Sequence, residues 1–219
     1  MNDLLERIQA EAAKGDMDVD APVYRDSGKD PTWPILAGTG DPNARLAVFG
    51  RDPGRHEVVH NEPFIGAGGQ LVRKALHEAA FGAPCTDLAG SIKAGQRIFW
   101  GNTVPYKPAG NKAWSVKVKR RFVPFITELL VDRWQGQHLI TLGNVAFDWF
   151  RLAEPGLAPL LKDHWAREDR YTSSLTVILA GKAITLHPLP HPSPLNATWY
   201  PRFPALVRER LASLDWNGA

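Results

Sequence analysis

Short apolar runs recur along the chain, and most of them end at a turn-forming or polar residue. Such runs, bounded by glycine, proline or asparagine, are typical of buried strands. We place strands at residues 45–50, 97–104, 138–144, 175–180 and 183–190.

Helical patterns occupy the stretches between these runs, with apolar residues spaced three or four positions apart. They lie at residues 68–82, 119–134, 145–152 and 203–214, and a further helix is expected near the N-terminus. We expect Pro124 to kink the second of these helices or to mark a late start. Continuous apolar strands that alternate with helices predict an α/β fold, a three-layer α/β/α sandwich with a central, mostly parallel sheet.

The length favours one domain. At 219 residues with 44% hydrophobic residues, the chain can bury a substantial core, and two independent domains would be cramped. We therefore expect a single domain over residues 1–219, with an N-terminal helix and loop extension at about 1–44. Residues 16–44, rich in Pro, Gly and Asp, are expected to form an ordered loop.

Charge and cysteine content narrow the class of protein. The net charge is +3 and the sequence "KVKRR" concentrates positive charge at residues 117–121, which suits a polyanionic partner without requiring one. The lone Cys85 excludes an internal disulfide and an all-cysteine metal cluster within one chain. The N-terminus has no uncharged apolar segment. We expect a monomeric cytoplasmic protein with no membrane partner.

Polar side chains follow several of the predicted strands. Because ligands of parallel sheets bind outside the carboxyl ends of the strands, these side chains are expected to converge at one edge. They are Asp52, Asn102, Asn144, His187 and His191.

Each residue also has an ordinary structural interpretation. Asp52 alone is more often a turn or cap residue, and Asn102 a turn former. His187 and His191 have the spacing of a metal pair, but the intervening prolines exclude the helix that such a pair needs, so no metal is expected. The glycine-rich "GAGGQ", residues 66–70, could receive a phosphate at a helix start, although it matches no established nucleotide-binding motif.

Four motifs together resemble the uracil-DNA glycosylase superfamily over roughly residues 45–200. They are "GRDPG", "PFIGAGGQL", "GNTVPYKP" and "HPSPLN", in this order along the chain. "GRDP" and "HPSPL" are similar to the catalytic motifs of family one, whereas "PFIGAGGQL" and "YKPAGN" are more similar to family four. Family-four enzymes carry an iron-sulfur cluster, and this chain lacks their cysteines. The resemblance therefore implies the fold without the cluster and with no other cofactor.

The resemblance also implies roles for the residues that could hydrolyse the bond. Releasing a base passes through a cationic sugar and an anionic base, so the site needs negative charge near one and donors near the other. Asp52 would position the attacking water and stabilise the sugar. His191, as neutral imidazole, would donate to uracil O2, with backbone amides around Gly50 and Arg51 beside it.

Base selection would depend on a second group of residues. The Asn102 amide can accept from uracil N3–H and donate to O4, a pattern that cytosine reverses. Phe64 would stack on the base, although a core phenylalanine is an equal alternative. Gly54 stands where family one places the tyrosine that blocks thymine, and the family-four pattern points to Glu57 as the residue that excludes the methyl group.

Contacts with DNA are expected from two segments. Leu195 would fill the gap left by the flipped nucleotide, and Ser193 would bond a flanking phosphate. The basic residues expected on the DNA backbone are Lys112, Lys117, Lys119, Arg120 and Arg121, with a solvated helix face as the equal alternative.

The sequence thus predicts a monofunctional uracil-DNA glycosylase that acts on uracil-containing DNA in base excision repair. Two other interpretations stay open, a hydrolase of free nucleotides or nucleosides and a non-catalytic nucleic-acid-binding module of the same fold.

Overall fold

The computed structural model describes residues 2–35 and 37–218. Its centre is a sheet in the order β1-β3-β2-β4-β6-β5. The four central strands run parallel, whereas β1 and β5 are antiparallel edges. The strands are β1 Thr39–Gly40, β2 Leu46–Gly50, β3 Phe99–Asn102, β4 His138–Leu142, β5 Leu175–Leu179 and β6 Lys182–Leu189. The predicted α/β fold with a mostly parallel sheet is confirmed.

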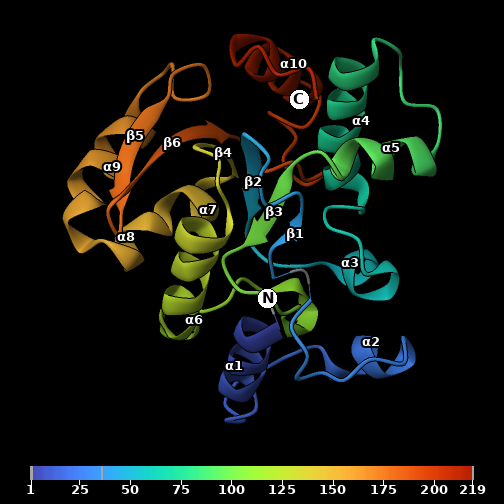
Figure 1. The fold of residues 1–219 in the computed structure, drawn as a ribbon, viewed down its shortest axis with the longest axis vertical. Coiled ribbons are helices and arrows are strands. Elements are labelled where there is room, and N and C mark those ends of the chain that lie inside the picture. Colours follow the sequence, from blue (N-terminus) through green and yellow to red (C-terminus); the bar gives the residue numbers. More distant parts are fainter. Residues whose placement is uncertain (1, 36, 219) are drawn as a thin grey trace.

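Helices cover both faces of this sheet (Figure 1). They are α1 Asn2–Ala12, α2 Ala21–Asp26, α3 Arg55–His60, α4 Ala67–Phe81, α5 Leu88–Gly95, α6 Val116–Glu128, α7 Asn144–Asp148, α8 Phe150–Ala153, α9 Ala158–Ala166 and α10 Phe203–Ser213. Shorter helical turns are η1 Ala109–Asn111, η2 Leu129–Arg133 and η3 Pro155–Leu157.

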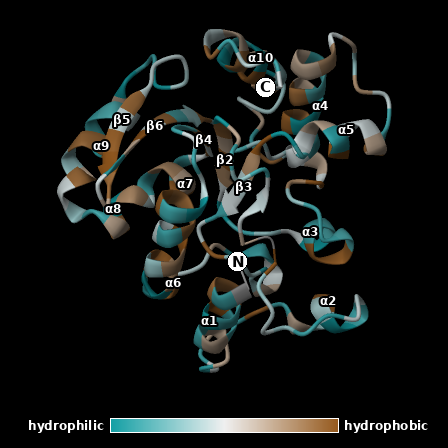
Figure 2. Ribbon diagram, viewed as in Figure 1, coloured by the Kyte–Doolittle hydropathy of each residue, from teal (hydrophilic) through white to brown (hydrophobic). Residues whose placement is uncertain are grey.

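Alternate residues of β2 face two separate cores. Ala47 and Phe49 pack in the core formed with α1, α6, α7, α8 and α9. Leu46 and Val48 pack in the core formed with α4, α5 and α10. The strand is apolar throughout because both of its faces are covered. Figure 2 shows the same arrangement, with hydrophobic residues along the strands and polar residues on the outer helix surfaces.

Several boundaries differ from the predicted ones. The helix expected at residues 119–134 begins at Val116, because Ser115 Oγ caps it by accepting from the Val118 amide at 3.2 Å. Pro124 lies inside this helix and does not start it, and a π-helical turn, η2, follows. The helix expected at 145–152 is divided at Trp149 into α7 and α8.

Four helices were not predicted, namely α2, α3, α5 and α9. Two of them have six residues each, which is fewer than two helical turns and too short for the spacing of apolar residues to identify a helix. The segment expected as a loop at 16–44 accordingly contains α2 and the short edge strand β1.

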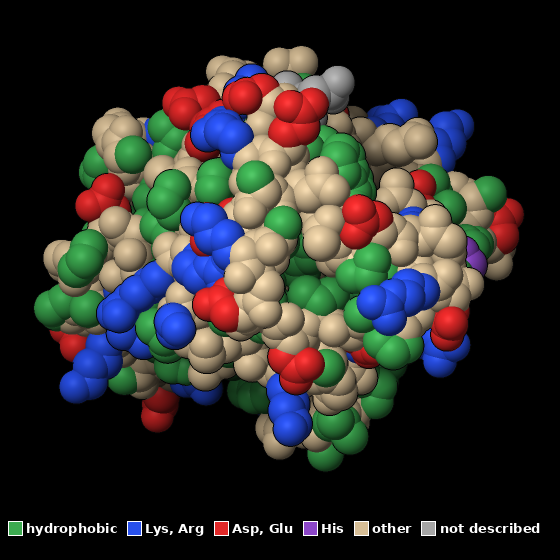
Figure 3. Space-filling view, turned by 90° about the horizontal axis from the view of Figure 1, so that it is seen from below, with side chains coloured by type: hydrophobic (Ala, Val, Ile, Leu, Met, Phe, Trp, Pro, Cys, Tyr) green, Lys and Arg blue, Asp and Glu red, His purple; other side chains and the backbone are tan. Residues whose placement is uncertain are grey.

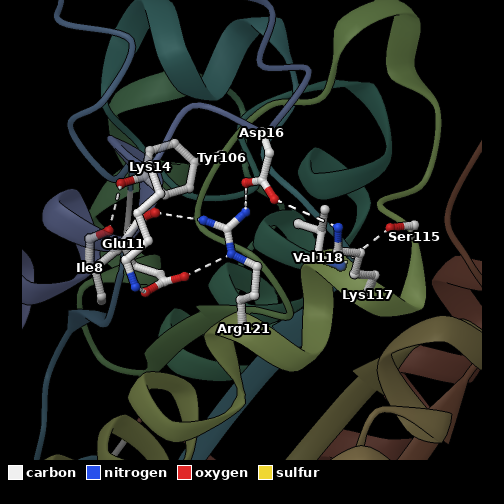
Figure 4. Close-up of polar contacts among 9 residues, drawn as sticks. All are labelled: Ile8, Glu11, Lys14, Asp16, Tyr106, Ser115, Lys117, Val118 and Arg121. Carbon is white, nitrogen blue, oxygen red and sulfur yellow. Dashed lines mark hydrogen bonds and ion pairs between the residues drawn. The ribbon is translucent and has the colours of Figure 1, made fainter.

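The N-terminal helix packs against α6 and contributes Leu4 and Ile8 to a core. Ion pairs hold the following segment in place (Figure 4). Arg121 Nε lies 2.7 Å from Glu11 Oε1, and its Nη1 pairs with Asp16. No helix in the described part of the chain is long and apolar enough to cross a membrane.

Candidate active site

A cavity of about 470 Å³ opens at the carboxyl ends of β2 and β4. Figure 3 views the molecule from below and shows Lys and Arg side chains gathered on one side of the face in view. The cavity is lined by residues 50–57, Phe64, residues 66–69, Pro108, Asn111, Leu142 and residues 191–194. The first, second and fourth of the sequence motifs thus contribute most of its wall.

Asp52 is the buried acid of this cavity. Its side chain is 1% exposed, and Oδ2 accepts a hydrogen bond from Arg51 Nε at 2.7 Å. Oδ1 is buried without a partner among the described residues. Burial raises the pKa of the carboxyl to about 6, although the charges of Arg51 and Lys119 oppose this shift. A buried carboxylate with one oxygen unsatisfied is unusual in a purely structural role.

Hydrogen bonds from two loops fix the position of the Asp52 corner. Thr103 donates from its backbone amide to Gly50 O at 2.9 Å and from Oγ1 to Arg51 O at 2.5 Å. Arg51 Nη2 in turn donates to the carbonyl of Asn111 at 3.1 Å. The corner is therefore held against the segment that follows β3. Sequence reasoning missed Thr103 and Asn111, although both lie within or next to the third motif.

His191 lies on the opposite wall of the cavity. It is solvent-exposed on one side, and its ring makes no hydrogen bond to any residue in the described ranges. Desolvation by the surrounding protein, together with the charge of Arg51, lowers the pKa of the imidazole, so the ring is neutral at pH 7. Gly143 has φ 84°, and a Cβ there would lie 2.9 Å from His191 Cβ. The close approach of the His191 segment therefore requires glycine at this position.

Asn102 ends β3 and pairs in register with Gly50. It is 5% exposed, and its amide has no hydrogen-bond partner in residues 2–35 and 37–218. It lies beside the cavity rather than among its lining residues. Phe64 does line the cavity and stacks on Trp100 with ring centroids 5.0 Å apart. A Cβ at Gly50 would lie 2.6 Å from Phe64 Cζ, so the missing side chain makes room for this ring.

Glu57 connects two parts of the cavity wall. Oε2 accepts from the Gly54 amide at 2.9 Å and Oε1 from the Gly66 amide at 3.0 Å. A Cβ at Gly54 would lie 2.6 Å from Glu57 Oε2, so the carboxylate occupies the space that a larger residue would take. A Cβ at Gly68 would collide with the carbonyl oxygen of Pro192. Close packing against the His191 segment thus explains this glycine without a bound phosphate.

His187 does not reach the cavity, contrary to the predicted convergence at the sheet edge. It lies inside β6, opposite Ile140, and is 2% exposed. Its Nε2 lies 3.1 Å from His138 Nδ1, and its Nδ1 lies 2.9 Å from Ser174 Oγ. Burial, with the charges of Arg210 and His138, lowers the pKa of this imidazole to about 3. His187 is therefore a buried structural histidine.

The predicted DNA-contacting segment after β6 is open to solvent. Leu195 is 95% exposed, and Ser193 Oγ accepts from the Leu195 amide at 3.3 Å. Arg55 and His56 are also exposed and line the cavity, and sequence reasoning missed both. The only signal for them was their position directly after the first motif.

The basic run divides into exposed and inward-facing residues. Lys112, Lys117 and Arg120 are exposed, with Lys117 Nζ 3.9 Å from Asp16. Lys119 is only 9% exposed and lines a different cavity. Arg121 is engaged by Glu11 and Asp16 (Figure 4), which makes it unsuited to contact a phosphate. The predicted backbone contact by Arg121 does not fit this arrangement, because its guanidinium is already paired, whereas Lys119 faces the second cavity and not the outer helix surface.

Two further observations concern metal binding and the similarity of the chain to a known family. Within residues 2–35 and 37–218, no cluster of three or more His, Cys, Asp or Glu side chains could hold a metal ion. A family model described as the Uracil DNA glycosylase superfamily matches residues 37–215. The match spans all of the strands and the residues that line the Asp52 cavity.

Proposed function

The chain belongs to the uracil-DNA glycosylase superfamily, and we propose that it hydrolyses the N-glycosidic bond of uracil in DNA. Membership assigns it to the glycosidases of base excision repair and makes DNA its partner. The proposed reaction is monofunctional and yields free uracil and an abasic site. As proposed, the enzyme acts in the cytoplasm as a monomer.

The observation that carries this proposal is the unpaired Oδ1 of the buried Asp52 carboxylate. Hydrolysis needs a water molecule directed at C1′ and negative charge near a sugar with cationic character. Because Oδ2 is held by Arg51, Oδ1 is the oxygen free to accept from that water. The same carboxylate stabilises the sugar, and its low-polarity surroundings strengthen the attraction.

His191 supplies the complementary donor for the departing base. Its lowered pKa keeps the imidazole neutral, so one ring N–H can donate to uracil O2 as negative charge develops there. Gly50 and Arg51 line the same cavity, and their backbone amides are proposed to support this role. Asp52 and His191 together meet both charge requirements, so the proposed reaction uses no metal or other cofactor.

The amide of Asn102 is proposed to select the base. The amide has no partner among the described residues, so its oxygen can accept from uracil N3–H and its nitrogen can donate to O4. Phe64 is proposed to stack on the flipped base from its position at the cavity wall. Glu57, held beside Gly54 by two backbone amides, is proposed to exclude the methyl group of thymine.

Two kinds of contact are proposed to hold the DNA. The exposed Leu195 fills the space of the flipped nucleotide, and Ser193 bonds a neighbouring phosphate. The exposed Lys112, Lys117 and Arg120 contribute to binding that weakens as salt rises.

Release of free uracil from a labelled oligonucleotide tests the proposal, with uridine nucleotides as competing substrates in parallel reactions. Uracil release from DNA alone supports it, and loss of this activity in Asp52→Asn but not in the exposed control Asp163→Asn assigns it to the site. Cleavage of free nucleotides would instead favour a nucleotide or nucleoside hydrolase. DNA binding without release would favour a non-catalytic module.

A further inference from the structure

A second cavity, of about 340 Å³, lies between α6, α7, α8 and α9. Its volume is within the range of small-molecule sites, which is about 300–1,000 Å³. Its walls include Lys119, Val145, Trp149, Leu161 and Trp165. Neither the sequence motifs nor the proposed chemistry gives it a role.

Aromatic and aliphatic side chains form most of this cavity. Trp149, Phe147 and Leu161 are each 1% exposed and form its buried part. Trp165 is partly exposed and packs on Phe147 with ring centroids 5.3 Å apart. A flat ring is the group that such walls accommodate best, because aromatic faces favour stacking.

Lys119 adds a positive charge to these apolar walls. It is 9% exposed, and its ammonium has no ion-pair or hydrogen-bond partner within the described ranges. Asp148, another lining residue, is already bonded through both carboxylate oxygens to Arg151 Nε at 2.7 Å. An ammonium without a partner beside apolar walls attracts an anion. The cavity therefore combines a ring-binding wall with an anion-binding group.

The second cavity and the Asp52 cavity are lined by residues that are close along the chain. Leu142 lines the first, and Asn144, two residues later, lines the second. Two residues span at most about 7 Å, a distance comparable to the step between successive nucleotides of an extended strand. Gly143, between them, contacts His191, and the charge of Lys119 acts on Asp52. No described residue lines both cavities, but their lining residues are separated by a single residue of the chain at this point.

Resting on the proposed glycosylase activity, we infer that the second cavity receives the base of a nucleotide adjacent to the target uracil. The base stacks within the aromatic walls, and a phosphate of the same strand meets Lys119. A neighbouring base can enter only when it is unpaired, because leaving a duplex costs unstacking and unpairing energy. The second cavity therefore contributes to the binding of single strands and not to the binding of duplexes.

The first experiment changes the DNA. Single strands carry uracil with a tetrahydrofuran abasic residue replacing the neighbouring nucleotide on the 5′ side, on the 3′ side, or on neither. Fluorescence anisotropy gives affinity, and single-turnover assays give uracil release. Removing the neighbouring base should weaken single-strand binding about tenfold, the size expected from one stacked base. This loss is expected for either the 5′ or the 3′ neighbour of the uracil, but not for both. The same replacement in a duplex should change binding less than twofold, as a rough bound for a base that stays in the stack.

The second experiment changes the protein. Val145→Trp fills the cavity and should weaken binding of the intact strand to the level of the abasic-neighbour strand, with no additional loss when both changes are combined. Duplex uracil release should stay the same. Lys119→Met should reduce the salt dependence of single-strand binding by about 0.7 in the log-log slope. The exposed Lys74→Met, which removes the same charge elsewhere, is the matched control.

Each outcome is decisive for one of the two proposals. Equal affinity for intact and abasic-neighbour strands on both sides overturns the second base site, even if uracil is released normally. If no DNA releases uracil, the proposed function fails, while anisotropy on the same strands still tests the cavity. If Val145→Trp does not fold, the wild-type response to the abasic neighbour decides the question.

Discussion

His187 and His191 are four positions apart, and both were expected at the same edge of the sheet, yet their surroundings differ completely. Both ring nitrogens of His187 have partners, His138 and Ser174, and the side chain is buried. The ring of His191 has no hydrogen-bond partner in the described part of the chain and faces a cavity. Burial lowers the pKa of both imidazoles, so pKa alone does not distinguish them.

The surroundings of His187 and His191 differ in whether the hydrogen-bonding groups have partners within the fold. A polar group whose partners are all within the fold contributes to stability, and its removal leaves those partners unsatisfied. A polar group held in place without partners has capacity left for a ligand. Asp52 Oδ1 and the Asn102 amide belong with His191 in this respect.

The largest effect is expected from Asp52→Asn, which should lower kcat by about 10³-fold or more while changing DNA affinity far less. The same change should raise the free energy of unfolding at pH 7, on the order of 2 kcal/mol. Burial raises the folded-state pKa to about 6, so the ionised carboxylate opposes folding above that pH, and the amide removes this cost. Assays of turnover and urea unfolding check both parts. A less stable variant with normal turnover would place Asp52 among the structural residues.

Exchanging the two histidines for alanine tests the comparison directly. His191→Ala should lower kcat about 10²- to 10³-fold by removing a donor, with little effect on unfolding. His187→Ala should destabilise the fold by roughly 2–4 kcal/mol, because it leaves a cavity and two unsatisfied partners, with kcat per folded molecule unchanged. Parallel unfolding curves and active-site-normalised kinetics give both quantities. Loss of turnover in His187→Ala together with loss of stability in His191→Ala would contradict the roles given to these two histidines.

Asn102→Asp should lower uracil release about 10²-fold, an order-of-magnitude figure for replacing a donor with a group that repels uracil O4. The new carboxyl can accept from cytosine N4–H and, when protonated, donate to cytosine N3. Slow cytosine release, faster at lower pH, is therefore expected from a labelled duplex. Unchanged uracil release without any cytosine release would show that this amide does not face the base.

The pH dependence should reflect Asp52 and not His187. Catalysis needs the ionised carboxylate, so kcat should fall as pH decreases through about 6, approaching tenfold for each further unit. The pKa of His187 is about 3, so this ring stays neutral through that decline. Single-turnover rates between pH 4.5 and 8, as an approximate range around this pKa, give the profile. A flat profile would remove Asp52 from the rate-limiting chemistry.

The smallest effect is expected at Glu57, whose carboxylate is fully occupied by the Gly54 and Gly66 amides yet borders the cavity. Glu57→Ala should raise thymine release a few-fold and retain some uracil activity, while destabilising the fold by about 1–3 kcal/mol through the two orphaned amides. The exposed Glu168→Ala is the control. Unchanged selectivity with the expected destabilisation would place Glu57 wholly with the structural residues.

The sequence correctly predicted those features that depend on the pattern of neighbouring residues, such as the ends of strands. The apolar run before Asp52 and the prolines around His191 mark strand ends, and both residues line one cavity, as expected from the sheet. The prediction for His187 was wrong because this residue lies inside β6, two residues before its end, and the strand predicted at 183–190 already contained it.

Other features depend on partners distant in the sequence. Lys119 and Arg121 sit in a run of like charges that resembles a solvated helix face. Only the packing of α1 and α8 beside α6 shows that both side chains turn inward. The cavity around Lys119 likewise arises from four separate helices, and no motif marks it.

The ion pair between Arg121 and Glu11 has a consequence for the order in which the molecule assembles. These residues are 110 positions apart, so α1 cannot find its docking surface until α6 has left the ribosome. At usual elongation rates that interval lasts roughly 5 to 20 seconds. Throughout it, the apolar face containing Leu4 and Ile8 has no place to bury itself. Helix α1 therefore waits for an element that is synthesised much later, and until then its apolar face is open to chaperones and to other nascent chains.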